Sequence, residues 1–157
     1  MYTTHTTDAR VQAQASCVEH KILDHVKQAL RVTLDWKTPS IGLPRKVSSV
    51  QFTMKSFARH LKRMMELEER DGYMDEVREA KPNLDHRVAR LQRDHQEIRR
   101  RLSDLAPEVD AMPGLPEEQF EYISSQIVEL LDLVDQHDVA EIELLQETLL
   151  CDEGGEG

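Results

Sequence analysis

Residues 84–105 read LDHRVARLQRDHQEIRRRLSDL, and this stretch decides the fold. Apolar residues recur in it at alternating intervals of four and three, which places them on one face of an α-helix. Most of the other positions are charged or polar, as expected for the solvated side of a helix that packs through one face. The positions of the packing face are Leu84, Val88, Leu91, His95, Ile98, Leu102 and Leu105.

The ends of this helix are predicted from its flanking residues. Asn83 is a suitable N-cap, because its side chain can accept a hydrogen bond from a free backbone N–H of the first turn. Pro107 is expected to open the connection that follows, since proline cannot donate within a helix. The connection continues through Pro113 and Gly114, and Pro116 suits the first position of the next helix.

Two segments on either side show the same helical period. The second helix is expected to begin near Ser48 or Ser49, to end near Gly72, and to be followed by a short helical piece over 73–80. Its packing face is Val50, Met54, Phe57, Leu61, Met64 and Glu68. The packing face of the last helix is Phe120, Ile123, Ile127, Leu130, Val134, His137, Glu141 and Leu145.

The first helix is predicted over about 16–36, before a loop that contains Pro39, Gly42 and Pro44. Its expected packing face is Val18, Ile22, Val26, Ala29, Val32 and Trp36. Four amphipathic helices joined by short loops must bury their apolar faces against one another. The sequence therefore predicts an all-α fold, an antiparallel up-and-down four-helix bundle over 16–151. A flexible polar segment, 1–15, would precede it and an acidic, glycine-rich tail, 152–157, would follow.

Composition and charge narrow the setting of the protein. The polar N-terminus does not resemble a signal peptide, no apolar run approaches the ~18 residues of a membrane span, and two cysteines make no disulfide framework. We therefore expect a cytoplasmic protein that does not bind membranes. All 20 Lys and Arg residues lie at or before Arg101, while the overall net charge is −10. The negative total disfavours nucleic acid as a partner.

Several ionisable residues interrupt the apolar faces. His95, His137 and Glu141 occupy packing positions, and Glu68 extends the face of the second helix. A buried carboxylate is costly unless a cation or hydrogen bonds compensate it. His and Glu side chains that point into a bundle are the usual ligands of carboxylate-bridged metal centres. The mixed imidazole and carboxylate set suits iron, with manganese or zinc as competitors.

Further histidines extend the candidate set. His25 lies at the edge of the predicted first-helix face, His20 lies further round it, and His60 flanks the face of the second helix. One difficulty concerns depth, because His95 lies about eleven residues before the predicted end of its helix and His137 about twenty-one residues into the next. At about 1.5 Å per residue this is a mismatch of about 15 Å, which closes only if the connection over 106–115 climbs as extended helix.

The sequence resembles the hemerythrin-like (HHE cation-binding) family over about residues 16–155. The resemblance is carried by EHKILDH (19–25), FARHLKRMMELEERDGYM (57–74), LQRDHQEIRRRL (91–102) and DQHDVAEIELLQETLLCDEGG (135–155). It implies a non-haem iron centre, mononuclear or dinuclear, inside the bundle. Carried over by position, the implied ligands are His20 or His25, Glu68, His95, His137 and Glu141.

Two positions depart from the family pattern. The family places a histidine four residues before the glutamate of the second helix, where this chain has Met64. It often has a second histidine in the third helix, where this chain has Leu91 or Arg99. Five ligands could hold one ion firmly or two poorly, and an arginine near the site could neutralise the carboxylates in place of metal.

The resemblance implies a protein that binds or senses oxygen, nitric oxide, redox state or iron. A di-iron oxidase or peroxidase is left open and ranks last, because the sequence identifies no substrate pocket and no proton donor beyond the ligands. Its expected partners are a metal ion and a small diatomic ligand, and a protein partner or homodimer is left open. The alternative is a metal-free helical interaction module that kept the fold and lost the site. In that case the inward Glu and His side chains would pair with one another or with arginine.

Overall fold

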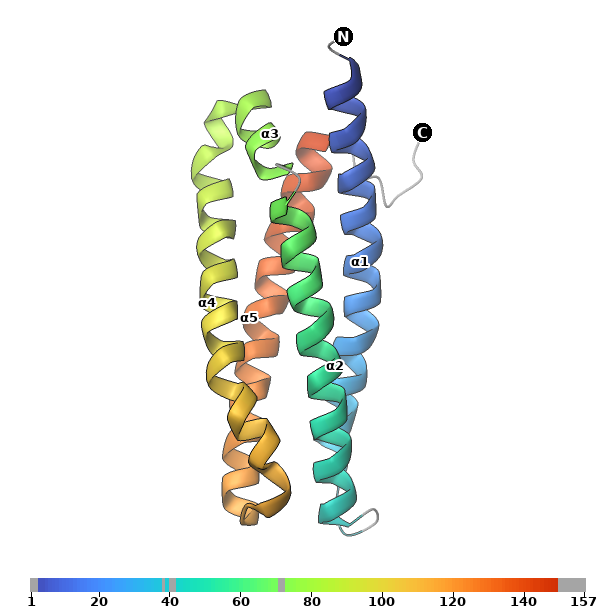
Figure 1. Cartoon of the computed structure of the whole chain (residues 1–157), viewed down its shortest axis with the longest axis vertical. Helices are drawn as coiled ribbons and strands as arrows, with labels where there is room; N and C mark the ends of the chain where they lie inside the picture. The colour runs from blue at the N-terminus through green and yellow to red at the C-terminus, as the bar shows by residue number, and fades with distance from the viewer. Residues whose placement is uncertain (1–2, 38, 40–41, 71–72, 150–157) are drawn as a thin grey trace.

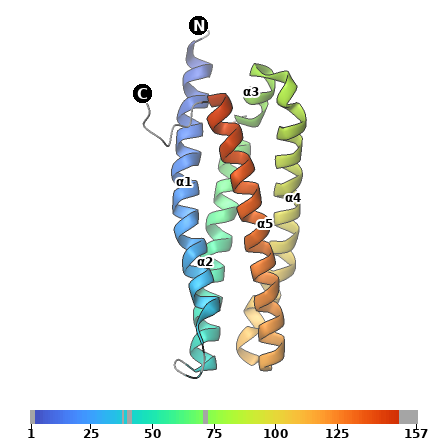
Figure 2. The same ribbon diagram turned by 180° about the vertical axis from the view of Figure 1, so that it is seen from behind.

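Four long helices run alternately up and down in a bundle, as Figures 1 and 2 show from opposite sides. The structure, a computed structural model, describes residues 3–37, 39, 42–70 and 73–149. The long helices are α1 (Thr3–Asp35), α2 (Leu43–Arg70), α4 (Asp85–Ala111) and α5 (Glu117–Leu149). The short helix α3 (Tyr73–Ala80) and the 3₁₀ turn η1 (Pro82–Leu84) lie at one pole, and a second 3₁₀ turn, η2 (Met112–Gly114), lies at the other.

The predicted all-α bundle is confirmed, and no strand occurs among the described residues. The predicted packing faces of α2, α4 and α5 are buried at every position. No helix in the described part of the chain is both long and apolar enough to cross a membrane. The predicted tail, 152–157, lies outside the described residues.

The predicted packing face of α1 is wrong by one residue. Val18, Ile22 and Val32 are 57%, 40% and 55% exposed, while Leu23 and Leu30 are buried. A shift of one residue turns a helix by about 100°, so the whole buried face is rotated. The reason is that Lys27 lies on the true face and is buried there at 5% exposure, against acidic side chains of α5. Because a lysine occupies that position, the pattern of apolar residues alone did not reveal the buried face of α1.

Several helix ends also differ from prediction. The helix α1 begins at Thr3, within the segment expected to be flexible, and α2 begins at Leu43 instead of Ser48 or Ser49. Gly42 supports this earlier start, because its φ of 82° allows the sharp entry and its carbonyl accepts the Lys46 N–H at 3.2 Å. Pro44 is compatible with it, since the first-turn N–H groups have no helical partner.

The ends of α4 and α5 bear directly on the site. Asn83 lies within η1 and makes no side-chain cap, because α4 begins after this 3₁₀ turn. Pro107 does not end α4, which continues to Ala111 and buries Val109. Pro116 immediately precedes α5, and its carbonyl accepts the N–H groups of Gln119 and Phe120 at 3.0 Å.

The apolar interior is divided into two parts by a polar layer. The larger part fills the bundle from η2 up to Met65 on α2, Ile98 on α4 and Val134 on α5. The smaller part lies beneath α3 and consists of Met74, Val77, Leu84, Val88, Leu91, Leu144 and Leu145. Between the two parts, each long helix contributes buried His, Glu or Asp side chains. The apolar parts supply the stability of the bundle, and the polar layer needs its own compensation.

The larger apolar part should dominate folding stability. Leu130 is fully buried in it, so Leu130→Ala should lower the free energy of unfolding by about 2–5 kcal/mol through lost burial and the cavity left behind. Val128, two residues away and 36% exposed, provides the control, and Val128→Ala should change it by less than about 1 kcal/mol. Urea unfolding measures both; equal losses in the two variants would contradict this packing.

Candidate metal centre

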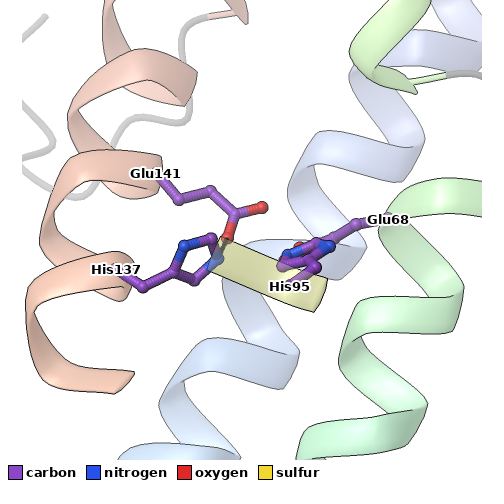
Figure 3. Close-up of side chains that lie close together, drawn as sticks. All are labelled: Glu68, His95, His137 and Glu141. Carbon is purple, nitrogen blue, oxygen red and sulfur yellow. Dashed lines mark ion pairs between the residues drawn. The ribbon is translucent and has the colours of Figure 1, made fainter. Parts of the chain in front are cut away.

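The polar layer brings together side chains from all four long helices. His20 comes from α1, Glu68 from α2, His95 from α4, and His137 with Glu141 from α5. All five are at most 2% exposed. Figure 3 shows four of them, Glu68, His95, His137 and Glu141, directed toward a common point. One ligand atom from each of these four lies within 4.8 Å of the others.

The Nε2 atoms of the three histidines face the two glutamates. Glu68 has Oε1 at 3.2 Å from Nε2 of His20 and Oε2 at 3.2 Å from Nε2 of His95. The Oε2 atom of Glu141 lies 3.0 Å from Nε2 of His137 and 3.7 Å from Nε2 of His20. His20 joins the other four through these contacts with Glu68 and Glu141, and it also forms a second set of possible ligands with Asp138 and Glu141. We call these five residues the inner group.

The Nδ1 atom of each histidine faces a different carboxylate. His95 Nδ1 lies 2.7 Å from Glu69, His137 Nδ1 lies 3.0 Å from Asp94, and His20 Nδ1 lies 3.5 Å from Asp138. Metal-binding histidines commonly donate their second ring N–H to such a carboxylate, which fixes the orientation of the ring. We call Glu69, Asp94 and Asp138 the outer carboxylates. This arrangement leaves every Nε2 directed at the inner group.

The arrangement of the inner group suits a bound metal ion better than it suits hydrogen bonding among the five residues. The close contacts of the three Nε2 atoms lack hydrogen-bond geometry, although all three atoms are buried. Neighbouring ligand atoms around an octahedral ion, each about 2.1 Å from it, lie about 3 Å apart. The observed contacts of 3.0–3.7 Å are close to that spacing. Mixed nitrogen and oxygen donors of this kind bind divalent transition metals.

Protonation of the inner group is shaped by burial and by mutual charge. Burial lowers the pKa of His20, but Glu68, Glu141 and Asp138 outweigh it and raise the pKa to about 9. Burial and the charge of Glu68 raise the pKa of Glu141 well above its usual value. Burial also opposes ionisation of Glu68, but contacts with His20 and His95 hold its pKa well below the usual value. Without metal, protons therefore compensate part of the negative charge, and a bound cation would displace them.

The predicted depth mismatch between His95 and His137 does not exist. Because α4 continues through Pro107, Ala111 lies 16 residues beyond His95, and His137 lies 20 residues beyond Glu117 at the start of α5. The turn η2 takes up the remaining difference, and the two rings have centroids 4.8 Å apart. The connection climbs as helix, which was the condition for a shared site.

Two of the candidate ligands lie away from the cluster. His25 is exposed on α1, because the rotation of the buried face turns it outward and brings His20 inward. His60 lies partly exposed on α2, two turns before Glu68. Neither belongs to a cluster of possible ligands in the described part of the chain. Met64, at the position of the missing family histidine, is fully buried.

The outer carboxylates were not predicted as site residues, because none of them interrupts the periodic apolar face of a helix. Each is adjacent in sequence to a member of the inner group: Glu69 follows Glu68, Asp94 precedes His95, and Asp138 follows His137. An acidic residue beside each inward position was the available signal. The pairing itself could not be read from the chain, since Asp94 binds His137 on another helix rather than its neighbour His95.

Comparison with known proteins agrees with this geometry. The family model described as "Hemerythrin HHE cation binding domain" matches residues 18–149. The match covers most of the chain and includes every inner and outer residue of the site. No curated protein and no solved structure matches the chain.

The metal-free protein should become less stable as the pH rises. A folded-state pKa of about 9 against 6.5 for an ordinary histidine means that His20 stabilises the fold below pH 6.5 and loses this effect as the pH rises to about 9. At about 1.4 kcal/mol per pKa unit the loss is on the order of 3 kcal/mol. Chemical unfolding with chelator present, at the two ends of this range, measures it.

The control for this prediction is on the same helix. His20→Gln should flatten the pH dependence of unfolding, while His25→Gln, at an exposed position, should keep the wild-type profile. An undiminished dependence in His20→Gln would show that another group causes it.

Proposed function

Since the chain belongs to the hemerythrin HHE cation-binding family, we propose that its inner group binds iron and that the protein binds or senses oxygen, nitric oxide, redox state or iron through it. The observation that supports this most strongly is the convergence of five buried donor groups from four helices. The residues that would hold the iron are His20, Glu68, His95, His137 and Glu141.

The donor set favours iron for chemical reasons. Imidazole and carboxylate together suit iron, and the possible ligands among the described residues are His, Glu and Asp side chains. The two glutamates balance the charge of a ferrous ion inside an otherwise apolar core. When bound, the iron would supply a redox-active centre able to take up a diatomic ligand.

The number of donors points to one firmly held ion per chain. Five groups could hold one ion firmly and would leave it able to take an exchangeable ligand. Glu68 contacts both His20 and His95 through separate oxygens, so it would help to hold the ion together with both imidazoles. A second set of possible ligands, His20, Asp138 and Glu141, shares two residues with the inner group, and Lys27 contacts its Asp138 at 2.8 Å. Met64 supplies no further imidazole.

Iron uptake should depend on Glu141. Wild-type protein incubated anaerobically with ferrous iron and then desalted should retain about one iron per chain, measured by elemental analysis, whereas Glu141→Ala should lose most of it. Glu143→Ala is the matched control, because Glu143 is exposed on the same helix two residues away. Equal retention by wild type and Glu141→Ala, or none by either, would remove the proposal.

Metal removal separates the proposal from a metal-free interaction module. If iron binds only the folded chain, adding a chelator to loaded protein should lower Tm by several degrees. A metal-free module would also contain the contacts of His20 with Glu68 and of His137 with Glu141. A Tm that is the same with iron and with chelator would favour that module.

Restoring the missing histidine should strengthen the site. Met64 lies one turn before Glu68 on the same buried face of α2, so Met64→His adds an imidazole beside the inner group. The variant should retain more iron per chain than the wild type, approaching two, or release it more slowly to a competing chelator. Met54→His places the same group in the apolar core and should show neither effect. Wild-type iron content and release in Met64→His would contradict the proposed position of the centre.

A further inference from the structure

Two basic residues lie behind the outer carboxylates without contacting the inner group through any described ion pair. We infer that Arg99 and Lys27 are positioning residues of the metal centre, because each holds the carboxylate that orients a ligating histidine. Arg99 acts on His95 through Glu69, and Lys27 acts on His20 through Asp138. This inference rests on the proposed function and adds two residues to the site that are not ligands.

Arg99 fixes Glu69 in a two-point contact. Its Nη1 lies 2.8 Å from Oε1 and its Nη2 lies 2.7 Å from Oε2 of the same carboxylate. The Oε1 atom also lies 2.7 Å from Nδ1 of His95. Glu69 has 35% of its side chain exposed, so water competes for it, and the two-point contact restricts it to the orientation that meets the imidazole.

Lys27 fixes Asp138 from within the bundle. Its ammonium lies 2.8 Å from Oδ2 of Asp138, 2.7 Å from Asp135 and 3.0 Å from Asp24. Lys27 is 5% exposed, and a buried ammonium is tolerated only with such partners. The other oxygen of Asp138, Oδ1, lies 3.5 Å from Nδ1 of His20. Both atoms are buried and neither has a hydrogen-bond partner, so each is the nearest group available to the other.

The geometry assigns Asp138 to this supporting role rather than to the metal. It faces Nδ1 of His20, whereas both glutamates face Nε2 of the same ring. An imidazole that offers Nε2 to a metal has Nδ1 free to donate to a carboxylate. Asp138 also forms a set of possible ligands with His20 and Glu141, but Lys27 holds its Oδ2, and binding an ion through Oδ1 would end the contact of that atom with Nδ1 of His20.

Charge gives a second reason for the two cations. Five carboxylates lie in or next to the polar layer: Glu68, Glu69, Asp94, Asp138 and Glu141. One ferrous ion balances two of them. Arg99 and Lys27 add two positive charges, although Lys27 also contacts Asp24 and Asp135. Asp94, with 24% of its side chain exposed, is open to solvent. Arg99 lies one turn beyond His95 on α4, which brings its guanidinium to the carboxylate that His95 also contacts.

The test compares two variants with two control variants on the same helices. Arg99→Gln and Lys27→Gln remove the supporting charges; the controls are Arg100→Gln, whose partners are Glu97 and Asp104, and Arg31→Gln, whose partners are Asp132 and Asp135. For each protein we would measure the affinity for ferrous iron against a competing chelator, the visible absorption spectrum of the cobalt(II)-loaded form, and the Tm of the metal-free form.

Arg99→Gln and Lys27→Gln should bind ferrous iron about 10- to 100-fold more weakly and shift the cobalt(II) bands, as expected when a support of a ligating histidine is removed. Both controls should retain wild-type affinity and spectrum. Arg99→Lys, which keeps the charge but not the two-point contact, should fall between wild type and Arg99→Gln. A purely structural role would lower Tm without moving the cobalt(II) bands of the loaded protein.

The outcomes separate this inference from the function on which it rests. If wild type binds iron and both Gln variants match it in affinity and spectrum, the positioning role is wrong and the iron site stands. If wild type binds neither iron nor cobalt, the proposed function fails, and the positioning role fails with it.

Discussion

A helical bundle can bury ionisable groups only where their charges are balanced, and this constraint governs the whole structure. Three histidines and two glutamates lie between two apolar regions, each at most 2% exposed. Their desolvation would cost several kcal/mol per uncompensated charge. Protons and mutual contacts offset part of that cost in the metal-free protein, as the opposite pKa shifts of Glu68 and Glu141 show. A divalent cation would offset more, because every Nε2 and both carboxylates already face one volume.

The balance extends outward in layers. Behind the imidazoles lie three carboxylates, and behind two of these lie Arg99 and Lys27. The acidic helix α5, which contains no Lys or Arg, binds Lys27 of α1 through Asp135 and Asp138. Attraction between Lys27 of α1 and these acidic side chains of α5 therefore helps to set the rotation of α1, and that rotation brings His20 into the centre.

Much of this was predictable from the sequence, and the failures share a physical origin. Apolar period alone located the buried faces of α2, α4 and α5 and the inward placement of Glu68, His95, His137 and Glu141. It failed on α1, because the true face includes Lys27 and Thr33, which look like surface residues until their tertiary partners are known. It also misplaced two helix ends. The helix α2 begins directly after Gly42 rather than at Ser48 or Ser49 and buries Val47, and α4 continues past Pro107 and buries Val109. The outer carboxylates depend on contacts between helices, which no local pattern contains.

X-ray absorption spectroscopy at the iron edge of the loaded protein tests the central claim most directly, because it reports the ligands of the ion itself. Scattering from three imidazoles within a mixed nitrogen and oxygen shell is the expected result, falling to two imidazoles in His20→Gln and remaining at three in His25→Gln. A shell made of oxygen alone, or one that is the same in wild type and His20→Gln, would mean that the ion lies elsewhere and that the buried histidines and glutamates balance one another without it.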